Sequence, residues 1–500
     1  MDNESGNYII FKRRYIMGKK IPMWQCLIVI VAMLAFLIWE IVICKDEEGH
    51  LALICAAIVA AVVAIANGWK WSYLEQGIIM AISRSMQAML ILMMVGLLIG
   101  SWIPGGVIPS LIYYGLMVLN PTIFLFAGCL LCCIVSLATG TSWGTAGTIG
   151  VALIGVGMGL GINPAMTAGA IVSGAYFGDK MSPLSDTTNL APAVAGSTLF
   201  DHIRHMCCTT GPSLGIALIV YLILGLKAGG DADMSYVTAL MADIKSEFSI
   251  SLFYLLPPVF VIACVALKLP ALPSLIGGVL MGVGCMAVQG IVDPKAWMLT
   301  LNYGFESANA NPDLVELLSG GGMQNMMWTI SLIMCAMVFG GIVDCTGIMA
   351  TFASVLLKLA RGTRGGLVFM TIFSCIFVNA VCCDQYLAII LPGRMYKEAF
   401  EDMRLKPKNL SRCLEDAGTI TSQFFPWNTC GATMRTFLGV NQWGTGGYGP
   451  YAILNWCNPI VSIIYGFTGI SMEKMTEEEY EKVLKEREAE KKAALETLSA

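Results

Sequence analysis

Apolar residues along this chain form long continuous runs instead of the narrower stripes of a water-soluble fold. A helix needs roughly 20 such residues to cross the hydrocarbon core of a membrane. Long runs occur near residues 24–44, 51–67, 78–103, 107–119, 122–138, 206–226, 250–268, 272–292, 326–349, 366–382 and 451–470. Interrupted apolar stretches lie between them, at 145–178, 183–200, 385–393 and 424–440. The pattern predicts an all-α polytopic membrane protein with about 10–12 transmembrane helices and several broken or re-entrant hairpin segments.

The composition excludes a soluble alternative. Charged residues make up 13% of the 500 positions, about half the share in a typical soluble domain. Of these 64 residues, 15 lie in the last 28 positions and 7 in the first 20, which leaves 42 over residues 21–472. So few charges cannot cover a water-exposed surface. We therefore expect the lipid bilayer as the partner of this chain and, because no basic face is present, no nucleic acid.

The 18 cysteines are scattered through the apolar runs. One CxxC pattern, Cys129 to Cys132, lies inside an apolar segment and has no second pair at metal-site spacing. Small buried apolar side chains are the simpler interpretation. We expect no cofactor.

Basic residues set the expected orientation. Lys12, Arg13 and Arg14 precede the first apolar run, so the positive-inside rule predicts a cytoplasmic N-terminus in the inner (cytoplasmic) cell membrane. The basic loop 394–412 is expected on the same side, and no cleavable signal peptide is expected. The predicted division of the chain is an N-terminal segment, a first membrane repeat, a linker, a second membrane repeat and a solvated cytoplasmic C-terminal helix, at residues 1–23, 24–226, 227–249, 250–471 and 472–500.

Polar residues interrupt the apolar runs in two related places. The first pair of segments covers residues 140–148 and 178–189, and the second covers 379–386 and 426–433. Thr141 precedes Pro183 by 42 residues, and Asp384 precedes Pro426 by the same 42 residues. Matching interruptions in two halves of a transporter point to its binding site. The spacing therefore predicts a repeat, with one polar site built from both halves.

The residue types at these interruptions suit a cation. Proline breaks a helix and frees backbone carbonyls, and hydroxyl, amide and carboxylate oxygens nearby complete a hard-oxygen cage. A buried carboxyl group holds its proton more tightly than one in water, so H⁺ and Na⁺ would compete for this cage. The residues first indicated in this way are Asp179, Ser185, Asp186, Thr187, Thr188, Asn189, Asn379, Asp384, Gln385, Asn428 and Thr429, with Na⁺ expected at Asp186, Ser185, Thr187 and Asp384.

Each carboxylate also has a purely structural interpretation. Asp179 adjoins Lys180 and could form an ion pair with it. Asp186 could cap a short helix. Asp384 could belong to a packing network with Asn379 and Gln385.

Segments 140–148, 178–191 and 384–393 closely resemble the NhaC-type Na⁺/H⁺ antiporter family. The resemblance covers nearly the whole chain and implies two inverted repeats, re-entrant hairpins, a scaffold part and a moving transport part. The family includes Na⁺/H⁺ exchangers, malate/lactate exchangers and carriers proposed for amino acids. At matching positions, the resemblance places one hairpin tip at Asp179, Ser182, Ser185, Asp186, Thr187, Thr188 and Asn189. It places the facing segment at Thr141 and Ser142, and the second-half counterpart at Asp384 and Gln385.

The sequence thus predicts a secondary active transporter, foremost a Na⁺/H⁺ antiporter. The main alternative is a Na⁺/H⁺-coupled exchanger or symporter of a small organic acid (malate or lactate) or an amino acid, and a remote one is a cation channel. Gly140 to Gly144 fits the GxSxG pattern of serine hydrolases but lacks its strand–turn–helix context, so no enzyme is expected. Pairing of two copies as a homodimer stays open.

Overall fold

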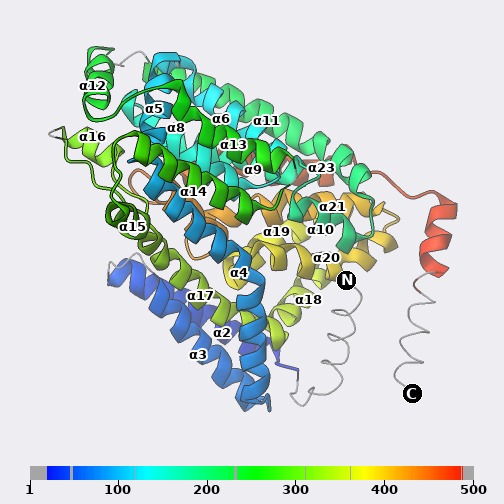
Figure 1. The fold of residues 1–500 in the computed structure, drawn as a ribbon. Coiled ribbons are helices and arrows are strands. Elements are labelled where there is room, and N and C mark those ends of the chain that lie inside the picture. Colours follow the sequence, from blue (N-terminus) through cyan, green and yellow to red (C-terminus); the bar gives the residue numbers. More distant parts are fainter. Residues whose placement is uncertain are drawn as a thin grey trace.

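The structure is a computed structural model that describes residues 20–44, 49–118, 120–229, 234–267, 269–309, 311–360, 362–485 and 487. All of its regular secondary-structure elements in these ranges are helices. Within these ranges the β contacts are two isolated bridges, Phe305 with Gly320 and Leu405 with Lys474. The predicted all-α class is confirmed (Figure 1).

Six helices in the described part are long and apolar enough to cross a membrane. They are α4 (Trp71–Trp102), α6 (Pro121–Thr139), α11 (Leu199–Gly229), α14 (Ala271–Val288), α17 (Met323–Cys345) and α19 (Arg364–Cys382). A pair bent by 94°, within α12 (Met234–Glu247) and α13 (Leu256–Ala266), would make a seventh. Shorter apolar helices are α2 (Met23–Ile38), α3 (His50–Ala66), α5 (Val107–Val118) and α18 (Ile348–Ala360). The chain is a multi-pass membrane protein, and α12 occupies most of the segment expected to link its halves.

The helices form two packed groups. Figure 1 shows α2, α3, α4 and α17 together on one side of the molecule, where α17 packs along α4 and α3. The other group joins elements far apart in the sequence. Here α6 packs against α9 (Pro164–Met181) and α11, while α19 packs against α20 (Gln385–Asp402) and α23 (Ile453–Thr468). Contacts of α11 and α9 with α23 tie the two halves of the chain together.

Each half contains a helix that breaks and restarts at once. α6 ends at Gly140, which has a left-handed φ of 73°, and Thr141 caps the next helix, α7 (Ser142–Thr145). α19 ends at Cys383 with φ 59°, and Asp384 caps α20. A second break follows in each half. It lies ahead of α10 (Asp186–Ala195) in one half and α22 (Thr429–Leu438) in the other, and the caps Ser185 and Asn428 each lie 44 residues after the first cap. The predicted repeat register coincides with these breaks.

The basic loop predicted at 394–412 is partly wrong. Its first residues, 394–402, continue α20, and residues 407–412 belong to α21 (Pro407–Leu414), which continues as the π-helix η4 (Glu415–Thr419). Pro407 stands in the second half where Pro164 begins α9 in the first, 243 residues earlier, the same offset that separates Thr141 from Asp384. Arg412 is fully buried. The hydropathy pattern did not predict that α21 and η4 are buried, because charged side chains that pair inside the protein look as polar in sequence as exposed ones.

The C-terminal segment is fastened to the membrane part. The predicted capping box is confirmed, since the Thr476 amide donates to Glu479 at 2.8 Å and the Glu479 amide donates to the Thr476 hydroxyl at 3.3 Å. Glu473 lies 2.6 Å from Lys408, whose hydrogen bond lowers the pKa of the Glu473 carboxyl. Further ion pairs are Arg404 with Glu477 and Lys406 with Glu479. The start of the tail is therefore docked rather than freely solvated, and the predicted part beyond residue 487 lies outside the described residues.

Close packing of α6 on α9 depends on Gly178. A Cβ at this position would lie 2.1 Å from backbone atoms of Ser136 and Leu137. The Ser136 hydroxyl bridges the two helices, because it donates to the Gly174 carbonyl at 2.8 Å and accepts from the Gly178 amide at 3.0 Å.

Gly178→Ala is therefore expected to force α6 and α9 apart and to cost about 1–3 kcal/mol of stability. Thermal unfolding of the purified protein in detergent measures this effect as a lower melting temperature. Gly211→Ala is the matched control, since a Cβ there meets open space. Equal melting of both variants and the wild type would show that the helices can separate without cost.

Candidate functional site

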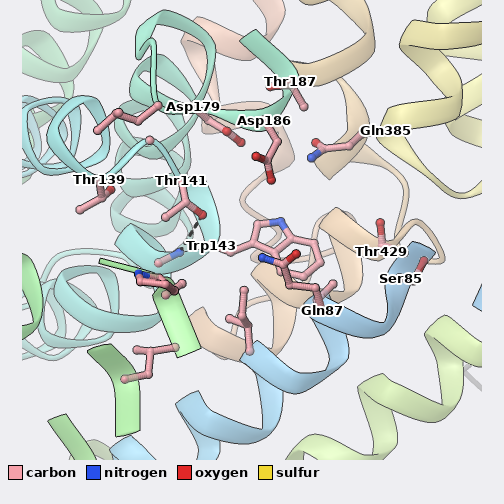
Figure 2. A pocket seen from close by; sticks show the side chains of 18 of the residues that line it. Ser85, Gln87, Thr139, Thr141, Trp143, Asp179, Asp186, Thr187, Gln385 and Thr429 are labelled. Carbon is pink, nitrogen blue, oxygen red and sulfur yellow. Dashed lines mark hydrogen bonds between the residues drawn. The ribbon is translucent and has the colours of Figure 1, made fainter. Parts of the chain in front are cut away.

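A cavity of about 380 Å³ lies where the broken helices of the first half face the start of α20. α4 forms part of its wall, and one side is apolar, with Val261, Ile262, Leu269 and Leu275. Figure 2 shows polar side chains from several elements pointing into the same space. Its polar lining is Arg84, Ser85, Gln87, Thr139, Thr141, Thr148, Asp179, Asp186, Thr187, Asp384, Gln385, Tyr386 and Thr429.

Asp179 is held at the cavity wall by two hydroxyl groups. Ser142 Oγ donates to its Oδ2 at 2.6 Å, and Ser185 Oγ donates to its Oδ1 at 2.7 Å. The Thr188 hydroxyl closes the end of α9 by donating to the carbonyl oxygens of Asp179 and Lys180 at 2.9 and 2.8 Å. Of the two interpretations left open, the ion pair is not formed, because the Lys180 ammonium donates to Asp416 instead.

Asp186 is the first residue of α10, and Ser185 occupies the cap position before it. The structure therefore does not use Asp186 as the cap residue. Its side chain lines the cavity, on the same side as Asp179, and in Figure 2 its carboxylate faces the space between Asp179 and the Gln385 amide. A negative charge in the first turn of a helix is favourable because it meets the positive end of the helix dipole.

Asp384 reaches the same cavity from the second half. Its carboxylate caps α20 by accepting from the Leu387 amide at 3.0 Å. The neighbouring Gln385 oxygen accepts from Cys430 Sγ at 3.1 Å and from Ser422 Oγ at 3.5 Å. Asp384 thus combines a structural cap with an oxygen available to the cavity.

The hairpin tip of the second half is fastened to the end of α19. The Asn428 side-chain amide donates to the Asn379 carbonyl at 2.9 Å, and the Trp427 indole donates to the Ala380 carbonyl at 2.7 Å. The Thr429 backbone amide donates to the Cys383 carbonyl at 3.0 Å. These bonds satisfy carbonyls that the end of a helix leaves without partners.

Half of the predicted site residues line the cavity: Thr141, Asp179, Asp186, Thr187, Asp384, Gln385 and Thr429. Ser142 and Ser185 stand behind them as partners of Asp179. The rest hold the backbone of the two tips, as hydrogen bonds from or to Ser182, Thr188, Asn189, Asn379 and Asn428 show. For this last group a direct role in ion binding stays a prediction, without support from the cavity geometry.

Residues from α4 were missed by the sequence reasoning. Arg84 and Gln87 line the cavity from one face of this helix. Arg84 also forms an ion pair at 3.0 Å with Asp344 of α17, while 42% of its side chain stays exposed. The sequence did contain a signal for Arg84, because a charged residue inside an apolar membrane span needs either a function or a partner of opposite charge.

Two broken helices that face one oxygen-lined cavity inside a membrane bundle define a secondary active transporter. The family model described as the Na⁺/H⁺ antiporter family matches residues 174–470. The chain belongs to this family, as its resemblance to NhaC-type proteins predicted.

Named relatives are similar over nearly their whole length. The Na⁺/H⁺ antiporter NhaC of Alkalihalophilus pseudofirmus is 38% identical over 92% of this chain and 98% of its own. The malate-2H⁺/Na⁺-lactate antiporter of Bacillus subtilis is 35% identical over 90% of this chain and 96% of its own. The arginine/ornithine antiporter ArcD of Halobacterium salinarum is 36% identical over 90% and 92%, respectively. Relatives of similar identity thus carry names with different cargoes.

Proposed function

We propose that this protein exchanges Na⁺ for H⁺ and that Na⁺ binds between Asp179 and Asp186. The observation that carries the proposal is the pair of carboxylates facing one cavity, one of them clamped by the hydroxyls of Ser142 and Ser185. Carboxylate, hydroxyl and carbonyl oxygens are hard ligands that suit Na⁺. Thr187 and Asp384 supply further oxygens to the same space.

Exchange follows from the cost of unbalanced charge. Asp179 is buried, whereas Asp186 is an exposed residue that faces the same cavity. A buried carboxylate is stabilised when a cation or a proton neutralises it, and a second carboxylate nearby repels its negative charge. A site that holds Na⁺ or H⁺, but not both, and opens to one side at a time moves them in opposite directions. We place the protein in the inner (cytoplasmic) membrane with its N-terminus in the cytoplasm, on the basis of its basic N-terminal residues.

The experiment uses purified protein in proteoliposomes with an imposed pH gradient and an internal pH dye. Na⁺ is added alone, and then with malate, lactate or a panel of amino acids. Collapse of the gradient by Na⁺ alone is the expected result. A gradient that persists until an organic solute is added would contradict simple Na⁺/H⁺ exchange.

An organic substrate is the second candidate, favoured by the size and lining of the cavity. A water molecule has about 30 Å³ of liquid volume, so 380 Å³ exceeds the needs of one partly dehydrated Na⁺. Small-molecule pockets usually measure about 300–1,000 Å³ and combine apolar walls with a few placed polar groups. Here Arg84 and Trp143 share the cavity with the apolar side chains Val261 and Leu275. An organic anion could place its carboxylate at Arg84.

If such an anion is carried, Arg84→Gln is expected to raise the KM for it at least about tenfold, because a charge-assisted hydrogen bond contributes about 1.5–3 kcal/mol. Uptake of radiolabelled malate, lactate or amino acid into proteoliposomes measures the KM. Arg204→Gln is the matched control, because Arg204 is an exposed residue of α11. An unchanged KM would remove Arg84 from substrate recognition.

A further inference from the structure

A buried cluster of charged side chains lies one residue beyond Asp179, and the proposed Na⁺ site does not use it. Lys180, Arg412 and Asp416 are all fully buried. Asp416 Oδ1 accepts hydrogen bonds from Lys180, from Thr209 at 3.0 Å and from Asn458 at 2.7 Å. Its Oδ2 lies 3.7 Å from Arg412 Nε. Two cations thus share one carboxylate, and these three groups carry one net positive charge.

Glu415 stands next to this cluster on the π-helix η4. It is fully buried, and neither of its carboxylate oxygens has a hydrogen-bond partner among the described residues. The Thr419 hydroxyl lies close enough to act on this carboxyl group, but the two make no hydrogen bond of normal geometry. Single π-turns inside helices are frequent at functional sites. An unpartnered buried carboxyl group is costly to keep for packing alone, which indicates a group that gains and loses a proton.

The charges around Glu415 come from several elements. The charged groups that act on it are Asp179 and Lys180 of α9 and Asp416 of its own helix, and the Cys375 thiol of α19 also interacts with it. α10 and α20 also pack against η4, and their Ala191 and Ile389 belong to the same apolar cluster as Ala417 of that helix.

Two histidines of α11 border the same cluster. Arg412 donates to His205 Nε2 at 3.1 Å, which makes this histidine nitrogen an acceptor and the ring neutral. His202 Nδ1 lies 2.8 Å from the Ser411 hydroxyl. Among these groups, Glu415 is the carboxyl group without an assigned partner.

We propose that Glu415 is a second proton-binding group of the exchange cycle, linked to Na⁺ at Asp179 through the Lys180–Asp416–Arg412 cluster. The inference rests on the proposed Na⁺/H⁺ exchange and deepens it. With Glu415 protonated the cluster carries one positive charge, and with Glu415 ionised it is neutral. When Na⁺ arrives at Asp179, the O–H bond of the Glu415 carboxyl breaks, the proton leaves to water and the carboxylate keeps the electron pair. The total charge of the two sites is thereby conserved.

The test is the proton release that accompanies Na⁺ binding. Purified wild-type protein and Glu415→Gln are titrated with NaCl in weakly buffered detergent solution containing a pH dye, and the Kd for Na⁺ is measured at several pH values. Thermodynamic linkage makes the slope of log Kd against pH equal to the number of protons displaced. Glu415→Gln is expected to bind Na⁺ with a slope closer to zero by about one proton and to release correspondingly fewer protons.

Glu401→Gln is the matched control, since Glu401 is another buried glutamate, at the end of α20 and outside this cluster. A wild-type slope in Glu415→Gln would overturn the inference. If that variant does not fold, Glu415→Asp replaces it, and a shifted pH midpoint supports the proposal while a wild-type midpoint and slope overturn it. Wild-type protein that releases no proton on Na⁺ addition would instead refute the proposed exchange itself.

Discussion

Asp179→Asn is expected to reduce Na⁺-driven proton movement in proteoliposomes at least about 100-fold, equivalent to about 2.7 kcal/mol. The substitution removes the charge that would hold Na⁺. It also replaces one carboxylate oxygen by an amide group, which cannot accept the hydrogen bond that Ser142 or Ser185 donates. The initial rate of internal pH change after Na⁺ addition measures the effect.

Asp201→Asn serves as its control, because Asp201 is an exposed residue at the start of α11 whose carboxylate accepts from the Thr198 hydroxyl. It should exchange at the wild-type rate. Ser142→Ala and Ser185→Ala each remove one of the two hydroxyl donors and should lower the rate less than the aspartate variant. Exchange by Asp179→Asn within twofold of wild type would leave Asp179 as a structural residue of the hairpin.

Asp186→Asn is expected to abolish Na⁺-dependent exchange with little loss of expression. The side chain faces the cavity, so removing its charge leaves the packing of α10 intact. Asp179 and Asp384 then remain as the carboxylates of the cavity, and Na⁺ binds to them more weakly than to all three. Isothermal titration with NaCl should show a Kd raised at least about tenfold, or 1.4 kcal/mol.

The two aspartate variants differ in what else they change. Asp179→Asn disturbs hydrogen bonds within the hairpin tip, whereas Asp186→Asn chiefly removes charge. A lower melting temperature is therefore expected for the first variant and an unchanged one for the second. Retained Na⁺ binding in Asp186→Asn would take this residue out of the site and leave Asp179 and Asp384 as the candidate charges.

The fold class and the position of the polar cavity were predictable because both depend on local signals. Long apolar runs predict membrane helices, and Pro183 and Pro426, each followed by hydroxyl or amide residues, mark the second break of each half. The shared 42-residue spacing located both breaks in both halves. What the spacing did not predict is the difference between the two tips, because that depends on which side chain reaches which carbonyl.

Hydropathy failed where charges are neutralised by partners far along the chain. Arg412 and Asp416 lie more than 200 residues from Lys180 and His205, and only the fold brings them together. The repeat register offered a way to find them, since Pro407 occupies the position of Pro164. Extending the register backwards from Pro426 would have placed Glu415 and Asp416 inside the bundle.

The two tips differ in what they contribute to the cavity. The second tip is tied to α19 through the carbonyls of Asn379, Ala380 and Cys383, whereas the first presents carboxylates and hydroxyls to the cavity. The second tip thus chiefly anchors the wall of the cavity, and the first carries most of its carboxylates. Substitutions at Asn428 should then be judged by whether they preserve anchoring, and those at Asp186 by whether they preserve charge.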